Sequence, residues 1–288
     1  MSSAKFVPPA PTATPAFGGT MGVRVLRAAP DMRLDKDDRV VVEAPLEFQL
    51  HHHTLGAEPA SFGATMRTPG DDESLAAGLL YGEGVIETAE DIEAIESSTR
   101  RPNVINVRLR STVQLETQMS QRRFSAGSSC GVCGTTGLDA AIARAAATHI
   151  RDTGSASLEV LLRLPERMRK EQSRFDNTGG IHAAALFNYS GELLGVAEDV
   201  GRHNAFDKLV GENLLAGRLP FTHRIVILSG RASFELVQKA LRAGVSILAA
   251  IGAPSSLAVN LSVASGLTLA GFLKEDYCNI YANPQRLS

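Results

Sequence analysis

The stretch Arg224-Ile225-Val226-Ile227-Leu228-Ser229-Gly230-Arg231 decides the fold class. A short run of mostly β-branched residues ends in a glycine turn, and a helical stretch follows it. The apolar run Val245–Ile251 ends in Gly252-Ala253-Pro254-Ser255-Ser256, and we interpret Ile181–Leu186 as the same kind of unit. Strand, glycine turn and helix in succession are typical of an α/β layered domain, where ligands bind at the carboxyl ends of the strands.

Composition divides the chain into three parts around this unit. Residues 1–20 are rich in Pro, Ala and Thr and lack apolar periodicity, which predicts a disordered tail. Residues 21–118 have the pattern of a small α+β domain, and residues 119–288 form the α/β domain. The elements predicted for the small domain are strands within Arg24–Leu50, among them Arg39–Glu43 and Leu46–Leu50, a helix over Leu75–Tyr81 and an extended segment over Val104–Leu115.

The composition of the whole chain excludes several classes of protein. The 288 residues carry 29 Lys+Arg and 31 Asp+Glu, so bulk charge does not hold this protein to nucleic acid or an anionic membrane. The longest apolar stretch, near Val245–Ala253, is about half the ~20 residues of a membrane span. No secretory signal precedes Gly18, and three cysteines are too few for a disulfide scaffold. We therefore expect a cytoplasmic protein.

The strongest chemical motif is the loop Ser128-Ser129-Cys130-Gly131-Val132-Cys133-Gly134-Thr135-Thr136. Two thiols at this spacing can ligate a metal, form a reversible disulfide or pass a sulfane sulfur, and each role needs a thiolate. The alternative is a pair of small apolar fillers. A zinc site would need further ligands, but there is no second CxxC and Cys278 is distant. The H-x-E motif of zinc deaminases is also absent, which weakens but does not remove the hydrolase interpretation.

The segment Glu198–Lys208 is the second cluster of polar residues. On a helix, His203 and Asp207 share one face, and Asn204 shares another with Lys208. The guanidinium of Arg202 is suited to phosphate or carboxylate. A solvated helical face is the alternative interpretation of this segment.

Two predicted strands end in turns that open helices, Ser229–Ser233 and Gly252–Ser256. Exposed backbone N–H groups at such turns favour a phosphate, although serines there are also common helix N-caps. His182 follows a glycine pair and is interpreted as a structural histidine when taken alone. Together with Arg202, the two turns predict a ligand that carries phosphate. We interpret His51-His52-His53 as a surface feature.

The ordered set of motifs closely resembles the formate dehydrogenase accessory sulfurtransferase family, called FdhD. The resemblance runs from about Arg39 to Tyr281. The segments that carry it are Glu43–Leu46, Met66–Pro69, Leu79–Gly84, Ser128–Gly134, Thr178–Ala183, Glu198–Lys208, Ser229–Glu235 and Ala253–Ala258.

The resemblance implies a cytoplasmic sulfurtransferase and a homodimer. Such a protein accepts sulfur from a cysteine desulfurase and passes it to the molybdenum cofactor, a bis(molybdopterin guanine dinucleotide), before insertion into formate dehydrogenase. Cys130 would carry the persulfide and Cys133 would assist or receive it. The family's larger domain is similar to cytidine deaminase, which implies a three-layer α/β/α sandwich beside the smaller α+β domain.

The same resemblance implies a cofactor-binding stretch at Phe272-Leu273-Lys274-Glu275-Asp276-Tyr277. A guanine dinucleotide would also explain Arg202 and Arg231 as phosphate neighbours, and we place His182 and His203 with them. No tightly held metal is expected. Two other classes stay open, a zinc-dependent hydrolase of deaminase type and a non-catalytic cofactor chaperone. Cys278 has no assigned role.

Overall fold

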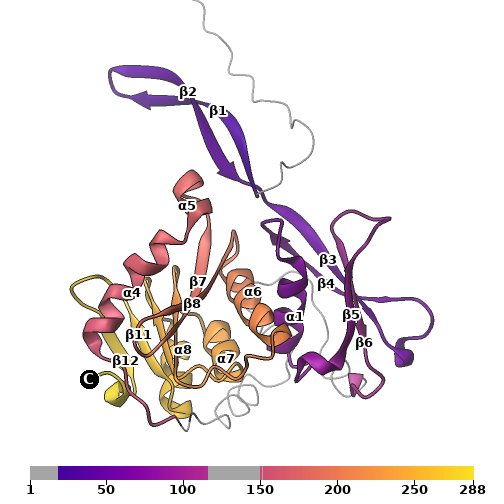
Figure 1. Ribbon diagram of the computed structural model, residues 1–288. Helices are drawn as coiled ribbons and strands as arrows, with labels where there is room; N and C mark the ends of the chain where they lie inside the picture. The colour runs from indigo at the N-terminus through magenta and orange to yellow at the C-terminus, as the bar shows by residue number, and fades with distance from the viewer. Residues whose placement is uncertain (1–18, 116–149, 151) are drawn as a thin grey trace, which may run out of the picture.

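The computed structural model describes residues 19–115, 150 and 152–288 (Figure 1). Cys130, Cys133 and nearly all of the helix expected over Leu138–Ile150 lie outside the described residues, as do most of the tail and the domain boundary expected at residue 118. The described chain forms two sheets with helices and a separate two-stranded hairpin. The α/β class is therefore confirmed. No described helix combines the length and the apolar character needed to cross a membrane.

The larger sheet has six strands in the order β12-β11-β10-β9-β7-β8. Its parallel centre is β9, β10 and β11, while β7 runs antiparallel to both β9 and β8, and β12 runs antiparallel to β11. The carboxyl ends of β8, β9, β10 and β11 therefore meet the start of β7 at one edge. The strand bounds are β7 His182–Asn188, β8 Leu193–Asp199, β9 Arg224–Leu228, β10 Ile247–Ala250, β11 Thr268–Gly271 and β12 Asn279–Ala282.

Helices cover both faces of this sheet because the sheet is apolar on both sides. Alternate residues of β7 illustrate this, since Ala184 and Leu186 belong to one buried cluster and Ala185 and Phe187 to another. The first cluster contains α6, α7 and α8, and the second contains α4. The helix bounds are α4 Leu158–Lys170, α5 Ser173–Thr178, α6 Arg202–Leu215, α7 Phe234–Arg242 and α8 Ser256–Ser265, and a 3-10 helix covers Pro284–Arg286.

The smaller sheet has the strand order β4-β3-β6-β5, with α1 on one face. In β3, Leu46, Phe48 and Leu50 are buried while the residues between them are not, as expected for a strand with one covered face. The bounds are β3 Ala44–His51, β4 Ala60–Arg67, α1 Asp72–Gly82, β5 Ile92–Ser97 and β6 Val104–Leu109, with 3-10 helices at His53–Leu55 and Ala89–Asp91.

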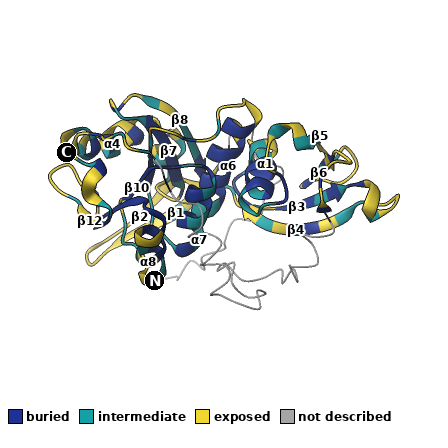
Figure 2. Cartoon of the chain, turned by 90° about the horizontal axis from the view of Figure 1, so that it is seen from below, coloured by how far each residue is buried: buried dark blue, intermediate teal, exposed yellow. Residues whose placement is uncertain are grey.

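Helices α1 and α6 join the two sheets, and both are largely buried between them (Figure 2). Their backbones touch at two glycines. A Cβ atom on Gly78 would lie 1.8 Å from the carbonyl oxygen of Asp207, and one on Gly211 would lie 1.8 Å from that of Ser74. No side chain fits at either position, so the small domain is held tightly against α6.

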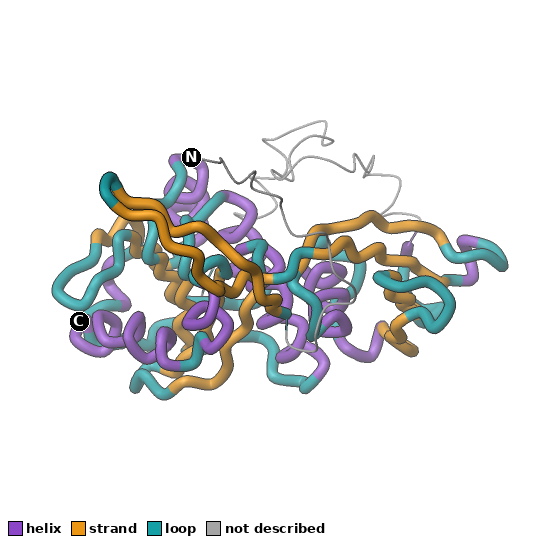
Figure 3. Tube along the Cα trace, turned by 90° about the horizontal axis from the view of Figure 1, so that it is seen from above, coloured by secondary structure: helices purple, strands orange, loops and turns teal. Residues whose placement is uncertain are grey.

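The hairpin of β1 (Thr20–Ala29) and β2 (Met32–Val41) projects from the body (Figure 1). Seen from above, it leans over the six-stranded part of the molecule, and β2 contacts α5 (Figure 3). Most of its residues are exposed. The strand predicted at Arg39–Glu43 is confirmed only for Arg39–Val41, which is the end of the much longer β2, and Glu43 lies outside any strand.

Several predicted elements are confirmed, and two predictions are wrong. The helix over Leu75–Tyr81 lies in α1, and Arg224–Leu228 is β9. The run at Ile181–Leu186 is followed by the antiparallel strand β8 and not by a helix, because Gly191, at φ 81°, allows a tight turn. The extended segment ends at Leu109 and does not reach Leu115.

Candidate functional site

The strand-end edge of the six-stranded sheet brings together the described residues predicted for a site. His182 pairs with Asp199 across β7 and β8. A Cβ atom on Gly230 would lie 3.2 Å from Cε1 of His182 and 3.6 Å from Cδ of Arg202. Gly252 also lies close to Gly230, since a Cβ atom on Gly252 would lie 2.9 Å from the Gly230 carbonyl oxygen. Close approaches therefore connect the end of β9 with the start of α6.

Arg202 is the most unusual group of this edge. It is the first residue of α6, and its Nε atom is buried without a hydrogen-bond partner. Among the described residues, no carboxylate forms an ion pair with its guanidinium. Gly201 is the N-cap of this helix and supplies no capping side chain. Glu235 acts on Arg202 only through longer-range attraction, so the positive end of the helix coincides with a cation that has no close ion pair, an arrangement that favours an anion.

The N-termini of α7 and α8 differ from that of α6 because serines cap them. The Ser233 hydroxyl accepts a hydrogen bond from Leu236 N at 3.4 Å, and the Ser255 hydroxyl accepts one from Ala258 N at 3.3 Å. Of the two interpretations that the sequence left open for these turns, the capped turn describes both serines. Of these three helices, α6 is the one whose N-cap residue makes no side-chain hydrogen bond to the first turn.

His203 is held as a neutral ring. Its Nε2 lies 3.1 Å from the Ser233 hydroxyl and 3.4 Å from a carboxylate oxygen of Glu235. Burial, with the charges of Lys239 and Arg202 next in order, lowers its pKa from 6.5 to about 3. His203 therefore serves any ligand as a neutral group and adds no positive charge.

The helical face of His203 and Asp207 is buried, so the interpretation of a solvated face is wrong. Asp207 accepts hydrogen bonds from Lys239 Nζ at 2.6 and 2.8 Å. Burial raises the pKa of the Asp207 carboxyl to about 6, and it also raises that of Glu235. Sequence patterns assign no role to Glu235 or Lys239 in this cluster, because their charges meet α6 only once α7 packs beside it.

His182 is bonded at the end of β9. Its Nδ1 lies 3.2 Å from the Ser229 hydroxyl, which accepts a hydrogen bond from Ala183 N at 2.8 Å. Burial lowers the pKa of His182, and the nearby charge of Arg202 lowers it further. The Ser229 hydroxyl can donate its own hydrogen to Nδ1, which leaves Nε2 of the neutral ring as a donor.

The stretch from Phe272 to Tyr277 connects β11 to β12 at the same edge. Phe272 adopts a left-handed conformation at φ 50° and is 40% exposed, and Lys274 Nζ lies 5.0 Å from the centre of the Tyr277 ring. Glu275 and Asp276 are exposed, as is Arg231 on the β9 turn. Leu273 differs from its neighbours, because its side chain is buried in the core and its backbone N–H donates to Ala250 O at 3.0 Å.

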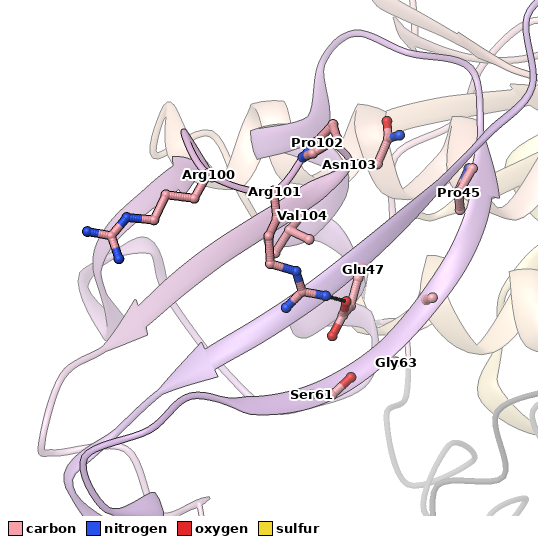
Figure 4. A pocket seen from close by; sticks show the side chains of 10 residues that line it. Pro45, Glu47, Ser61, Gly63, Arg100, Arg101, Pro102, Asn103 and Val104 are labelled. Atoms are coloured by element: carbon pink, nitrogen blue, oxygen red, sulfur yellow. Dashed lines mark hydrogen bonds and ion pairs between the residues drawn. The ribbon is translucent and has the colours of Figure 1, made fainter.

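A hollow of about 560 Å³ lies on the small domain and includes none of the predicted site residues (Figure 4). It covers the outer surface of β3 and β4, where Arg101 Nη2 lies 2.8 Å from a carboxylate oxygen of Glu47. Arg100 is exposed beside this pair. The hollow holds a surface ion pair in solvent and lacks the buried groups of the strand-end edge.

The cysteine motif cannot be placed, because Cys130 and Cys133 lie outside the described residues. Cys278 is half-buried, and burial raises its thiol pKa, which disfavours a thiolate there. Within the described ranges, no three His, Cys, Asp or Glu side chains are grouped as a metal would require.

Comparison with known proteins gives consistent relationships along the chain. Residues 41–288 match the model of the FdhD/NarQ family. A protein of Streptomyces avermitilis named sulfur carrier protein FdhD is 45% identical over 274 residues, which cover 92% of this chain and 94% of that protein. Proteins of the same name from Sulfolobus acidocaldarius and Mycobacterium tuberculosis are 40% and 39% identical, again over 92% of this chain and 97% of each relative.

A solved structure shares the fold. It is a chain from Desulfotalea psychrophila described as a candidate formate dehydrogenase accessory protein, and it superposes with a TM-score of 0.72 at 24% identity. The superposition covers 93% of this chain and 99% of the other. At this identity, the likeness concerns the arrangement of the two sheets and their helices.

Proposed function

The chain belongs to the FdhD/NarQ family, and on that premise we propose that it is a sulfur carrier acting in the maturation of formate dehydrogenase. Relatives named as sulfur carriers align over 92% of the chain, which supports this role. The finer parts of the proposal are the donor, the carrier residue and the acceptor. The donor is a cysteine desulfurase, and the protein works in the cytoplasm as a homodimer.

The proposed carrier is Cys130. Its thiolate attacks the terminal sulfur of the desulfurase persulfide, so that a new S–S bond forms on Cys130 while the donor's S–S bond breaks and its cysteine leaves as a thiolate. The thiolate of Cys133 then attacks the inner sulfur and forms a disulfide with Cys130. The terminal sulfur leaves as hydrosulfide, and a thiol reductant later reduces the disulfide.

The proposed acceptor is the molybdenum of a bis(molybdopterin guanine dinucleotide), which the protein binds as a substrate. One observation carries this part of the proposal, the unpaired guanidinium of Arg202 at the open N-terminus of α6. A diphosphate supplies the missing negative charge, and the first N–H groups of α6 are oriented to donate to it. The neutral rings of His182 and His203 flank this position and supply hydrogen-bonding groups without further charge.

We expect the six-stranded unit to share the layering of cytidine deaminase, with Phe272-Leu273-Lys274-Glu275-Asp276-Tyr277 contributing to the cofactor surface. In this proposal, Arg231 is a second, exposed neighbour of the phosphates. The side chain of Leu273 is excluded from direct contact because it is buried.

The decisive experiment follows sulfur on the protein. The full chain is incubated with a cysteine desulfurase and cysteine, and peptide mass spectrometry locates any added sulfur. We expect a mass increase of one sulfur on the Cys130 peptide, and loss of formate dehydrogenase activity in cells that carry Cys130→Ala. Full activity with Cys130→Ala would contradict the persulfide role.

The same material separates the other two classes. Stoichiometric zinc that disappears with Cys130→Ser would indicate the deaminase-type hydrolase, and metal analysis measures it directly. If Cys130→Ala and Cys133→Ala both support maturation and still bind guanosine diphosphate, the protein is a cofactor chaperone without a sulfur-transfer step.

A further inference from the structure

A buried ion pair lies directly behind Arg202. Asp199 is the last residue of β8, and its carboxylate is 2.8 Å from Lys208 Nζ on α6. Both side chains are inaccessible to solvent, with relative exposures of 0% and 1%. The proposed sulfur chemistry uses neither of them, so their burial needs another reason.

The Asp199 carboxylate organises the start of α6. One of its oxygens accepts hydrogen bonds from Gly201 N at 2.9 Å and from the Asn204 side chain at 3.1 Å. These are the residues on either side of the Arg202–His203 pair. Gly201 has no capping side chain, and Asp199 bonds the N–H of this N-cap residue, so Asp199 fixes where α6 begins while the N–H groups of the first turn have no side-chain cap.

The other oxygen of Asp199 faces the small domain. It accepts a hydrogen bond from Thr68 N at 3.0 Å, while Thr68 O accepts one from Lys208 Nζ at 2.9 Å. The Thr68 hydroxyl accepts a third, from Val200 N at 3.0 Å. The N–H, the carbonyl and the hydroxyl oxygen of Thr68 are thus bonded to the end of β8, to α6 and to the residue between them. The small domain therefore helps to determine where this connection lies.

Asn204 makes a second link of the same kind. Its side-chain nitrogen donates to Met66 O at 2.8 Å, and its oxygen lies 3.3 Å from the Thr65 hydroxyl. Arg202 itself has no such anchor among the described residues. Its position follows from the backbone on either side, which Asp199 and Asn204 hold.

From these contacts we propose that Asp199 is a positioning residue, which fixes Arg202 for its ligand by tying the first turn of α6 to Thr68. The inference rests on the proposed function, in which Arg202 receives a phosphate group of the cofactor. It adds that the small domain contributes to ligand affinity through Asp199, although it supplies no ligand-binding group in this network.

The test is a double-mutant cycle with guanosine diphosphate as the probe, measured by calorimetry on the full, folded chain. The variants are Asp199→Asn, Arg202→Gln and the two together. We expect Asp199→Asn to weaken binding by roughly tenfold, because small displacements of a binding group have effects of this size. Since Asp199 acts through Arg202, the double variant should bind about as well as Arg202→Gln alone.

The matched control is Asp152→Asn, which alters another buried carboxylate with several hydrogen bonds at the opposite edge of the same sheet. We expect it to lower stability and leave the affinity within about twofold of the unmodified protein. Equal weakening by Asp152→Asn would show a general effect of lost stability, which overturns the positioning role. The same conclusion follows if Asp199→Asn weakens binding equally with and without Arg202.

Two further results complete the test. If Asp199→Asn does not fold, Thr68→Val keeps the side-chain volume, removes the acceptor for Val200 N, and should still weaken binding several-fold. Unchanged affinity in Thr68→Val would then overturn the inference.

If the unmodified chain does not bind guanosine diphosphate, the proposed cofactor site fails, and the role of Asp199 fails with it. Binding that is insensitive to Asp199 overturns the inference alone.

Discussion

The two edges of the six-stranded sheet both contain a buried carboxylate, but they use it differently. At the edge where β9 and β10 begin, Asp152 accepts hydrogen bonds from Tyr189 at 2.6 Å, from Ser246 at 2.5 Å and from the backbone N–H of Gly154 and His223. Its side chain is 3% exposed and also lies 3.0 Å from Nε2 of His223. At this edge, hydrogen bonds from within the protein therefore satisfy the buried Asp152 carboxylate.

At the strand-end edge, Asp199 is equally buried and satisfied, yet Arg202 nearby forms no ion pair within the described residues, and its Nε atom is buried without a hydrogen-bond partner. A buried N–H donor without a partner is unfavourable unless something else accepts its hydrogen bond. The two edges therefore differ in how their buried polar groups are paired. One satisfies its carboxylate within the fold, and the other leaves the Nε donor of Arg202 without a partner, at the position proposed above for a ligand.

The largest expected effect is at the edge where β9 and β10 begin, and it comes from removing the buried Asp152 carboxylate. Asp152→Ala leaves the Tyr189 and Ser246 hydroxyls and two backbone donors without their acceptor. We expect a loss of about 3–5 kcal/mol in unfolding free energy, measured by urea denaturation. Affinity for guanosine diphosphate, measured under folding conditions, should not change. A loss below about 1 kcal/mol would show that this edge is not the stabilising one.

The second effect is at the strand-end edge and concerns Arg202. Arg202→Gln removes no ion pair and removes a buried donor that has no partner, so the unfolding free energy should not decrease. Affinity for guanosine diphosphate should fall by about 2 kcal/mol, or roughly thirtyfold, because a charge-assisted contact is lost. Calorimetry checks both expectations on one preparation. Unchanged affinity would contradict the assignment of this edge as the ligand site.

The third effect is a dependence of stability on pH, which is caused by His203 at the strand-end edge. The folded protein holds His203 with a pKa of about 3, whereas the unfolded chain binds a proton near its usual value of 6.5. The unfolded state therefore binds more protons as the pH falls below 6.5, and stability decreases by up to about 2 kcal/mol at pH 5.

In His203→Gln, the amide can still donate to Ser233, but the titrating group is gone. The variant should therefore lose less stability than the unmodified protein between pH 7 and pH 5, as measured by urea denaturation. Asp207 and Glu235 titrate in both proteins with raised pKa values, which act in the opposite direction. The difference between the two proteins isolates His203, and identical pH profiles would contradict its burial as a neutral ring.

The smallest effect concerns the helix N-termini that serine side chains cap. Ser255→Ala removes the acceptor of Ala258 N at the start of α8 and should lower the unfolding free energy by about 1 kcal/mol. Affinity for guanosine diphosphate should stay the same, because this serine already serves its own helix. A clear loss of affinity would mean that the α8 terminus also binds the ligand.

Much of the fold could be predicted because its signals are local. The run Arg224–Leu228 is mostly β-branched and ends at a glycine turn, and it forms β9 as expected. The failure at Ile181–Leu186 is also instructive. The strand itself was found, but its successor β8 is a half-exposed edge strand with a weak pattern, so a helix was expected in its place.

The candidate site was predicted in part. The segment was interpreted as helical with His203 and Asp207 on one face, and α6 confirms the helix, but its start at Arg202 was not predicted. Glu235, Lys239 and Asp199 could not be assigned, since their charges meet α6 only through packing between distant parts of the chain. The burial of Leu273 was likewise decided by neighbours that its sequence context does not reveal.

By itself, the sequence determined the α/β class, the order of strand, turn and helix around Ser229 and Gly252, the CxxC motif and the resemblance that led to the family. These depend on residues a few positions apart. Only the tertiary structure decided that β7 runs antiparallel to β8 and β9, which brings His182, Asp199 and Ser229 to one edge. It also decided that Lys208 and Lys239 are paired while Arg202 is not, because the partner of a charge depends on which segments burial of the whole core places side by side.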